Sequence, residues 1–254
     1  GIYAAEDVYT PDGTLRCKAG EKADTVTTRT DGKAESRPLY LGKYEIREEK
    51  APYGTVLTAD PTFVELTYAG QDVSVTAAVL SVTNKRQKAA VRIAKVLEKD
   101  VRFSLGENGE TESVVFGLYA AEACNAADGI CIPADGLIET ARCTPEGQAV
   151  FTADIPVGAK LYIREIAADA HYIVSDTQYP VEFTYAGQDT ALVEIRANGG
   201  EPVENRLKRG KVTGSKTDED GQIVSGAVFG LFAENETVFS ADTALLTAAS
   251  DADG

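Results

Sequence analysis

The sequence predicts an all-β chain built from tandem β-sandwich domains. Short runs rich in Val, Ile, Thr and Tyr alternate with turns that contain Gly or Pro, and none of them keeps a helical period. Whole segments also recur about one domain apart. Hydrophobic residues make up 43% of the chain, which is enough to fill packed cores.

The recurring segments set the domain boundaries. The octapeptide that begins at Glu65 (ELTYAGQD) returns 117 residues later at Glu182 as EFTYAGQD. The opening hexapeptide GIYAAE returns as GLYAAE over 117–122 and again as GLFAE over 230–234. We therefore expect a fragment of a longer rod. Its parts are a partial domain that lacks its first strand (1–88), a complete domain (89–209) and the N-terminal part of a third (210–254).

The middle domain carries enough turn signals for seven strands. We expect them near 90–97, 114–121, 137–143, 148–153, 160–166, 180–185 and 190–205. The stretch 121–136 reads as a loop, because no strand or helix period runs through it. The first and last strands of such a sandwich can lie side by side.

Composition argues against several functions. The net charge of −15 is unsuited to nucleic acid, which requires clustered Lys and Arg. No apolar run is long enough to span a membrane. The four cysteines (Cys17, Cys124, Cys131, Cys143) contain no CxxC pair, so neither a metal site nor a cofactor is expected. Free thiols, or a disulfide between two of the last three cysteines, both remain open.

Three polar residues of the middle domain lie on faces that are otherwise apolar. Strand side chains alternate with period two, so Lys95 follows Val91 and Ile93, Glu165 follows Leu161 and Ile163, and Asn205 follows Val203. The outer copies repeat parts of the pattern at Glu48, Asn84 and Lys216, each on a row expected to face inward. Buried charges need partners or must lose their charge.

This combination suggests a specific reaction. Burial lowers the pKa of a lysine, and a neutral amine is a nucleophile. A neighbouring Glu could polarise the Asn carboxamide and shuttle protons, so that Lys95 displaces ammonia from Asn205. Lys99 is a rival donor on the same stretch of chain. The alternative is a buried Lys–Glu pair that is hydrogen-bonded to Asn with no covalent bond.

At these residues the chain resembles the SpaA-type pilin and Cna B-type repeat family of Gram-positive surface proteins. The matching motifs are Lys216–Gly221 followed by Gly226–Leu231, Tyr44–Gly54, and strands that close on Asn84 and Asn205. The resemblance implies a prealbumin-like, Ig-like fold and a Lys95–Asn205 isopeptide bond with Glu165 as its catalytic residue. It implies equivalent roles for Glu48, Asn84 and Lys216, with the lysine donor for Asn84 and the acceptor for Lys216 outside the fragment. The middle copy departs from the motif over 167–172, where the family has a Pro-Gly turn.

The resemblance implies a structural stalk or shaft repeat of a cell-surface adhesin or pilin-like protein, located outside the cell at the cell wall. We expect no enzyme beyond the single-turnover cross-link. The partners would be neighbouring repeats of the same chain. The alternatives are a module that binds a host matrix protein or glycan through loops such as 121–136 and 167–179, and an accessory repeat of a larger surface enzyme. Tyr68 and Tyr185 could stack on a sugar, but we expect them to anchor their turns against the sandwich.

Overall fold

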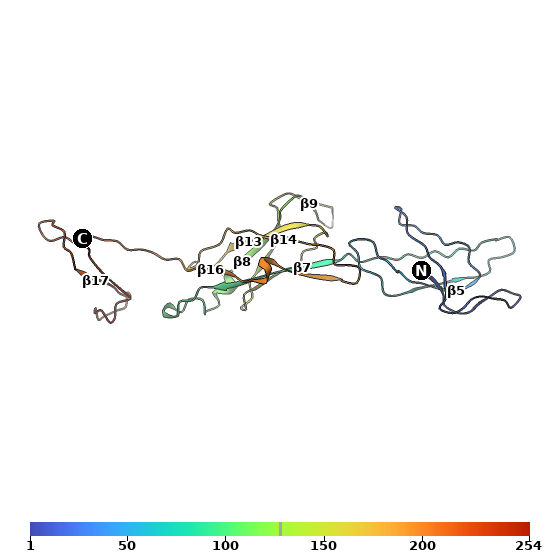
Figure 1. The fold of residues 1–254 in the computed structure, drawn as a ribbon, viewed down its shortest axis with the longest axis horizontal. Helices are drawn as coiled ribbons and strands as arrows, with labels where there is room; N and C mark the ends of the chain where they lie inside the picture. The colour runs from blue at the N-terminus through green and yellow to red at the C-terminus, as the bar shows by residue number, and fades with distance from the viewer. Residues whose placement is uncertain (127–128) are drawn as a thin grey trace. The chain divides into compact units, whose positions relative to one another are not determined.

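A computed structural model describes residues 1–126 and 129–254. The chain divides into two compact units, Gly1–Leu207 and Lys208–Gly254, and Figure 1 shows the strands of each. The described residues are almost entirely strand and turn, with three short 3-10 helices as the helical segments among them. This agrees with the all-β prediction, while the division of the first unit into two domains stays a prediction.

The middle repeat is a sandwich of two sheets. One sheet has the order β11 (Leu137–Arg142), β8 (Val115–Ala120), β13 (Lys160–Ala167), β14 (Tyr179–Glu182), and all its neighbours are antiparallel. The other has the order β12 (Gln148–Phe151), β7 (Lys88–Leu97), β15 (Leu192–Arg196). The short strand β16 (Val203–Asn205) also pairs with β7. This sheet arrangement places β7, as the central strand, next to both final strands of the repeat.

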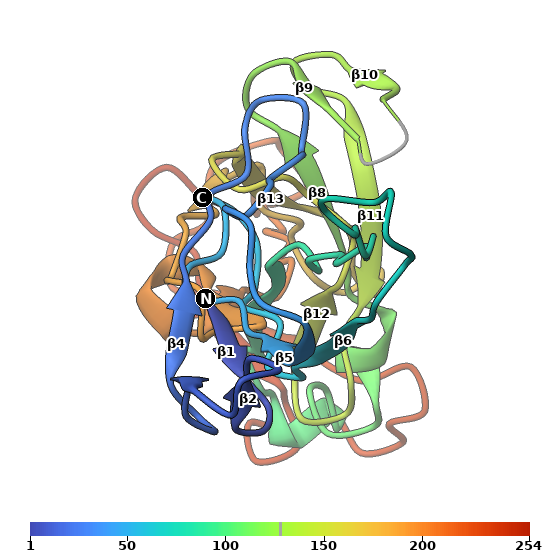
Figure 2. The same ribbon diagram turned by 90° about the vertical axis from the view of Figure 1, so that its right-hand side faces the viewer.

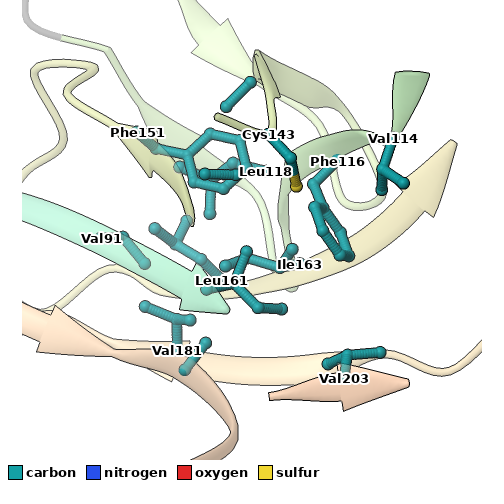
Figure 3. Close-up of a cluster of buried hydrophobic side chains, with 14 of the residues drawn as sticks. Val91, Val114, Phe116, Leu118, Cys143, Phe151, Leu161, Ile163, Val181 and Val203 are labelled. Carbon is teal, nitrogen blue, oxygen red and sulfur yellow. The ribbon is translucent and has the colours of Figure 1, made fainter. Parts of the chain in front are cut away.

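The inward faces of the two sheets form one apolar core (Figure 3). Val91 comes from one sheet, and Phe116, Leu161 and Ile163 come from the other; none of the four is more than 1% exposed. Each such side chain stabilises the fold by about 1.5–3 kcal/mol relative to an exposed position. The alternation read from the sequence therefore identifies the inward face of these strands correctly.

The last predicted strand, 190–205, is interrupted. It consists of β15 and β16, separated by the 3-10 turn η3 (Ala197–Gly200). Asn198, Gly199 and Gly200 have φ values of 53°, 63° and 87°, in the left-handed region that Gly and Asn tolerate best. The Asn-Gly-Gly triplet is therefore a turn, and it lets the chain return to β7 a second time.

The stretch expected as a loop contains a short hairpin. β9 (Cys124–Asn125) pairs with β10 (Cys131–Ile132), and residues 127–128 between them lie outside the described residues. Two 3-10 turns, η1 (Val101–Phe103) and η2 (Glu110–Ser113), connect β7 to β8.

The first repeat contains a single four-stranded sheet. Its order is β4 (Lys22–Asp24), β1 (Ile2–Ala4), β5 (Gly42–Ile46), β6 (Thr62–Leu66), and Figure 2 shows these strands side by side. A hairpin of β2 (Val8–Tyr9) and β3 (Leu15–Cys17) accompanies it. The buried residues of this core are Ile2, Ala4, Val8 and Tyr44.

Within the described residues the β2–β3 hairpin is the only other sheet at this core, because 25–41 and 67–85 form no strand. The row that leads to Asn84 is expected to face inward, and this expectation is wrong for its other members, Leu80 and Val82. They are 37% and 44% exposed, since no strand lies against them. Asn84 itself is half-buried.

Hydrogen bonds around Gln87 join the first repeat to the middle one. This side chain is 1% exposed, and its amide group donates to the carbonyl oxygens of Gly187 and Thr190 at 2.9 and 2.6 Å. Its carbonyl oxygen accepts from the N–H of Ala186 at 2.9 Å. Every polar atom of the buried amide is thus directed at the turn that contains the repeated Tyr-Ala-Gly-Gln-Asp sequence.

Tyr185 begins that turn, and it contacts the other repeat. Its hydroxyl donates to the carbonyl oxygen of Thr55 at 3.0 Å, and its ring lies 4.8 Å from that of Tyr53. Tyr185 therefore anchors its turn, as expected, and its partners Thr55 and Tyr53 belong to the first repeat. Its counterpart Tyr68 is 67% exposed, so the same expectation is wrong for the first repeat.

The second unit contains one hairpin, formed by β17 (Val228–Leu231) and β18 (Leu246–Ala249). The row that leads to Lys216 was expected to face inward, but Val212 is 87% exposed and Lys216 is exposed too. A two-stranded ladder has no second layer to bury such a row.

Candidate functional site: a buried Lys–Glu–Asn cluster

Three strands bring the predicted residues of the middle repeat together. β7 carries Lys95, β13 carries Glu165 and β16 carries Asn205, which are 5%, 3% and 1% exposed. β7 and β16 run parallel, with Val203 opposite Lys95. The adjacency of first and last strands that we expected is therefore present, and it places the amine beside the carboxamide.

The three side chains form a closed set of contacts. The Lys95 Nζ donates to Asn205 Oδ1 at 2.5 Å and lies 3.4 Å from each oxygen of Glu165. The Asn205 amide donates to Glu165 Oε1 at 2.6 Å. Hence the carboxylate touches both the nucleophile and the nitrogen that would leave. These are the positions that a proton shuttle requires.

Residues that the sequence did not single out complete the surroundings. The backbone N–H of Ser175 donates to Glu165 Oε2 at 2.9 Å and fixes the carboxylate. The ring of Phe116 lies 5.7 Å from the Lys95 Nζ, within the range of a cation–π contact. The thiol of Cys143 lies nearby, and burial raises its pKa to about 11, so it stays protonated.

The electrostatics of the cluster favour a neutral amine. Burial lowers the pKa of Lys95, although the charge of Glu165 and its hydrogen bond oppose that shift. Neither the Lys95 nor the Glu165 side chain has exposed area, so water cannot solvate either charge. Transfer of the lysine proton to the carboxylate removes both charges at once and leaves an amine that can attack.

Two hydrogen bonds of Glu98 connect the segment after β7 to Asn205 and to Tyr172, next to the cluster. The N–H of Glu98, the first residue after the end of β7, donates to the Asn205 carbonyl oxygen at 2.9 Å. The hydroxyl of the buried Tyr172 donates to the Glu98 carbonyl oxygen at 2.9 Å. The stretch 167–172, which differs from the family motif, thus contributes the core residue Tyr172 where the family has a Pro-Gly turn.

Lys99, the rival donor, does not reach the cluster. Its side chain is 59% exposed, and its Nζ lies 3.4 Å from Glu107. Among the two lysines considered, the structure places only Lys95 beside Asn205.

The first repeat holds the same carboxyl–carboxamide pair without a lysine. The Asn84 amide donates to Glu48 Oε2 at 2.6 Å and to the Val56 carbonyl oxygen at 3.0 Å. The N–H of Thr58 donates to the Glu48 carboxylate at 2.7 Å. In the middle repeat, 117 residues later, the N–H of Ser175 donates to Glu165 in the same way. Lys216, considered within the second unit, has neither an Asn nor a Glu partner among that unit's described hydrogen bonds and ion pairs.

The four cysteines are free thiols in this structure. Over 1–126 and 129–254 no cluster of three or more His, Cys, Asp or Glu residues could hold a metal ion. In the same residues there is no helix with the length and apolar character needed to cross a bilayer.

The comparisons address the fold. Residues 7–79 match the family model described as SpaA, prealbumin-like fold domain. The chain contains a SpaA-type prealbumin-like domain. This agrees with the resemblance that the Tyr44–Gly54 motif carries. No curated protein sequence matches the chain.

Several solved structures are similar to this chain. The Bacillus anthracis TIE protein matches with a TM-score of 0.55 and 19% identity, over 98% of this chain and 39% of its own. A C-terminal fragment of the pilus adhesin SpaC from Lactobacillus rhamnosus GG matches at 0.34 and 14%, over 84% of this chain and all of that one. GBS52, the minor pilin of Streptococcus agalactiae, matches at 0.32 and 15%, over 75% and 71%. The chain spans about two fifths of the TIE protein, and the likeness to it concerns the fold alone.

Proposed function

We propose that this chain is a stalk or shaft segment of a bacterial surface protein of the pilin or adhesin type, and that a Lys95–Asn205 isopeptide bond locks its middle repeat. The buried contact of Lys95 Nζ with Asn205, with Glu165 touching both, carries the proposal. The SpaA-type fold and the pilus proteins among its structural neighbours support the surface role.

The reaction balances within the cluster. Glu165 takes a proton from the Lys95 ammonium, and the free amine attacks the Asn205 carboxamide carbon. The carboxylic acid gives this proton to the Asn205 nitrogen, which leaves when the tetrahedral intermediate collapses. The carboxylate then takes the second proton from the attacking nitrogen and passes it to the released ammonia, which departs as ammonium. One C–N bond forms, one breaks, and Glu165 ends as it began. This is a single turnover and makes the chain a substrate of its own chemistry, not an enzyme.

A stalk function follows from where the bond would lie. It would connect the first and last strands of the middle repeat, so that unfolding could not begin by separating the ends of the domain. The partners proposed for such a segment are the neighbouring repeats, and its location is the cell surface. Recognition of a host protein or glycan through the loops 121–136 and 167–179 remains the alternative, and residues 127–128 of the first loop lie outside the described residues.

Intact mass spectrometry of the purified chain tests the proposal. We expect the mass to fall short of the sequence mass by one ammonia, and a Lys95–Asn205 linked peptide pair after proteolysis. Glu165→Gln keeps the shape of the side chain but cannot accept the proton, so this variant should retain the full sequence mass. Lys99→Gln is the matched control and should lose ammonia as the parent does. A parent chain of full mass would refute the covalent proposal.

A further inference from the structure

The strand that carries Asn205 has few backbone bonds of its own to fix its register. β16 has three residues, and the left-handed turn η3 interrupts the chain shortly before it. Against β7, Val203 lies opposite Lys95 and Asn205 lies opposite Leu97. A slip of one residue would turn the Asn205 side chain away from the cluster and bring Glu204 in, because strand side chains alternate. Reaction with Lys95 therefore depends on the contacts that hold this register.

Glu98 binds the chain on both sides of Arg206, directly beyond β16. Its N–H donates to the Asn205 carbonyl oxygen at 2.9 Å, and its carboxylate Oε2 accepts from the Leu207 N–H at 2.8 Å. In a parallel ladder, one residue bonds through its N–H and its C=O to the two residues that flank its neighbour. At Glu98 the side-chain carboxylate makes the second of these bonds. It thus prolongs the β7–β16 pairing past the end of both strands.

The Glu98 carbonyl oxygen connects to a second segment. It accepts from the hydroxyl of the fully buried Tyr172 at 2.9 Å. Tyr172 also forms a β-bridge with Leu207, and the N–H of Ile173 donates to the Arg206 carbonyl oxygen at 2.9 Å. The end of the repeat is therefore bonded to Glu98 and to the segment 172–173, and Glu98 is bonded to that segment as well.

We propose that the Glu98 carboxylate is a positioning group for the reaction of Lys95 with Asn205. By accepting from the Leu207 N–H, it holds β16 in the register that presents the Asn205 carboxamide to the amine. The inference rests on the proposed cross-link and assigns to it a residue outside the Lys–Glu–Asn cluster. Because this contact is with the backbone of Leu207, it acts on the position of Asn205 and not on proton transfer.

A time course of the newly made chain tests this role. The full chain is synthesised in a cell-free system and sampled at intervals. Protection of the buried Cys143 thiol from a pulse of alkylating reagent measures folding, and intact mass measures the loss of ammonia. In Glu98→Ala, Cys143 should become protected as fast as in the parent, whereas ammonia loss should slow by about tenfold or more, since misplaced reacting groups lose rate on this scale.

Two further variants separate position from charge. Glu98→Gln keeps an oxygen that can accept from the Leu207 N–H but carries no charge, so it should react at close to the parent rate. Glu165→Gln, by contrast, should not react at all. Glu107→Ala removes an exposed carboxylate from the same connection between β7 and β8 and should match the parent in both measurements.

Several results would overturn the inference. Equal rates of ammonia loss in Glu98→Ala and the parent would show that the register does not depend on the carboxylate. Slow loss in Glu98→Gln as well would assign the effect to charge. An equal delay in Cys143 protection would assign it to folding. These three outcomes leave the proposed function standing, whereas a parent chain that keeps its ammonia would refute the cross-link and this inference together.

Discussion

Replacing Lys95 by methionine tests how much the proposed cross-link would stabilise the middle repeat. Methionine keeps the length and apolar stem of the side chain but cannot form the bond. Glu165 keeps its hydrogen bonds from the Asn205 amide and from the backbone N–H of Ser175 in this variant.

The expected loss follows from the size of the closed loop. Lys95 and Asn205 are 110 residues apart in sequence. Cross-linking a loop of about 100 residues removes about 5 kcal/mol of conformational entropy from the unfolded state. For a unit of this size, about 2–4 °C per kcal/mol converts this to a fall in Tm of about 10–20 °C.

Scanning calorimetry of the parent, Lys95→Met and Lys99→Met measures this shift. The last variant removes an exposed lysine and should melt within about a degree of the parent, since surface substitutions rarely exceed ±0.5 kcal/mol. If the parent has lost ammonia but Lys95→Met melts at the same temperature, the cross-link does not govern unfolding, and the entropic argument is wrong.

Other parts of the structure lead to two further predictions. Because burial raises the pKa of Cys143 to about 11, an alkylating reagent at neutral pH should label the exposed Cys131 in the folded chain and reach Cys143 only in denaturant, as peptide mapping can check. Gln87→Ala leaves three hydrogen-bonding groups of the turn without their partner and should lower the unfolding free energy of the first unit by about 2–3 kcal/mol. A urea titration measures this loss, and Gln71→Ala, which removes an exposed side chain, should have no effect. Equal urea midpoints for Gln87→Ala and Gln71→Ala would contradict the role assigned to the Gln87 hydrogen bonds between the two repeats.

Period-two alternation was sufficient to find the cluster. It placed Lys95, Glu165 and Asn205 on inward faces, and the structure has each of them at or below 5% exposure. Alternation could not reveal Ser175, which contributes only a backbone N–H, or Phe116, which looks like any other core residue. Contacts of these kinds depend on how loops and sheets meet in space, and a local pattern does not encode that.

The errors have equally local causes. The Asn-Gly-Gly triplet at 198–200 is a turn signal. The prediction of one strand over 190–205 disregards this signal, and the strand is in fact interrupted there. The rows that lead to Asn84 and Lys216 match buried rows elsewhere, yet Val82 and Val212 on them are exposed, because a face is buried only when another element covers it. The inter-repeat role of Tyr185 was missed because repeated sequence was taken to mean a repeated environment.

The parallel pairing of β7 with β16 bears on how the middle repeat would carry tension. The chain enters this repeat through β7 and leaves it after β16. With Lys95 joined to Asn205, a force applied along the backbone would cross from one strand to the other through a single side-chain amide. The whole stretch 96–204 would then lie outside the mechanical path, so that its loops could vary or be cut without lengthening the load-carrying part of the chain.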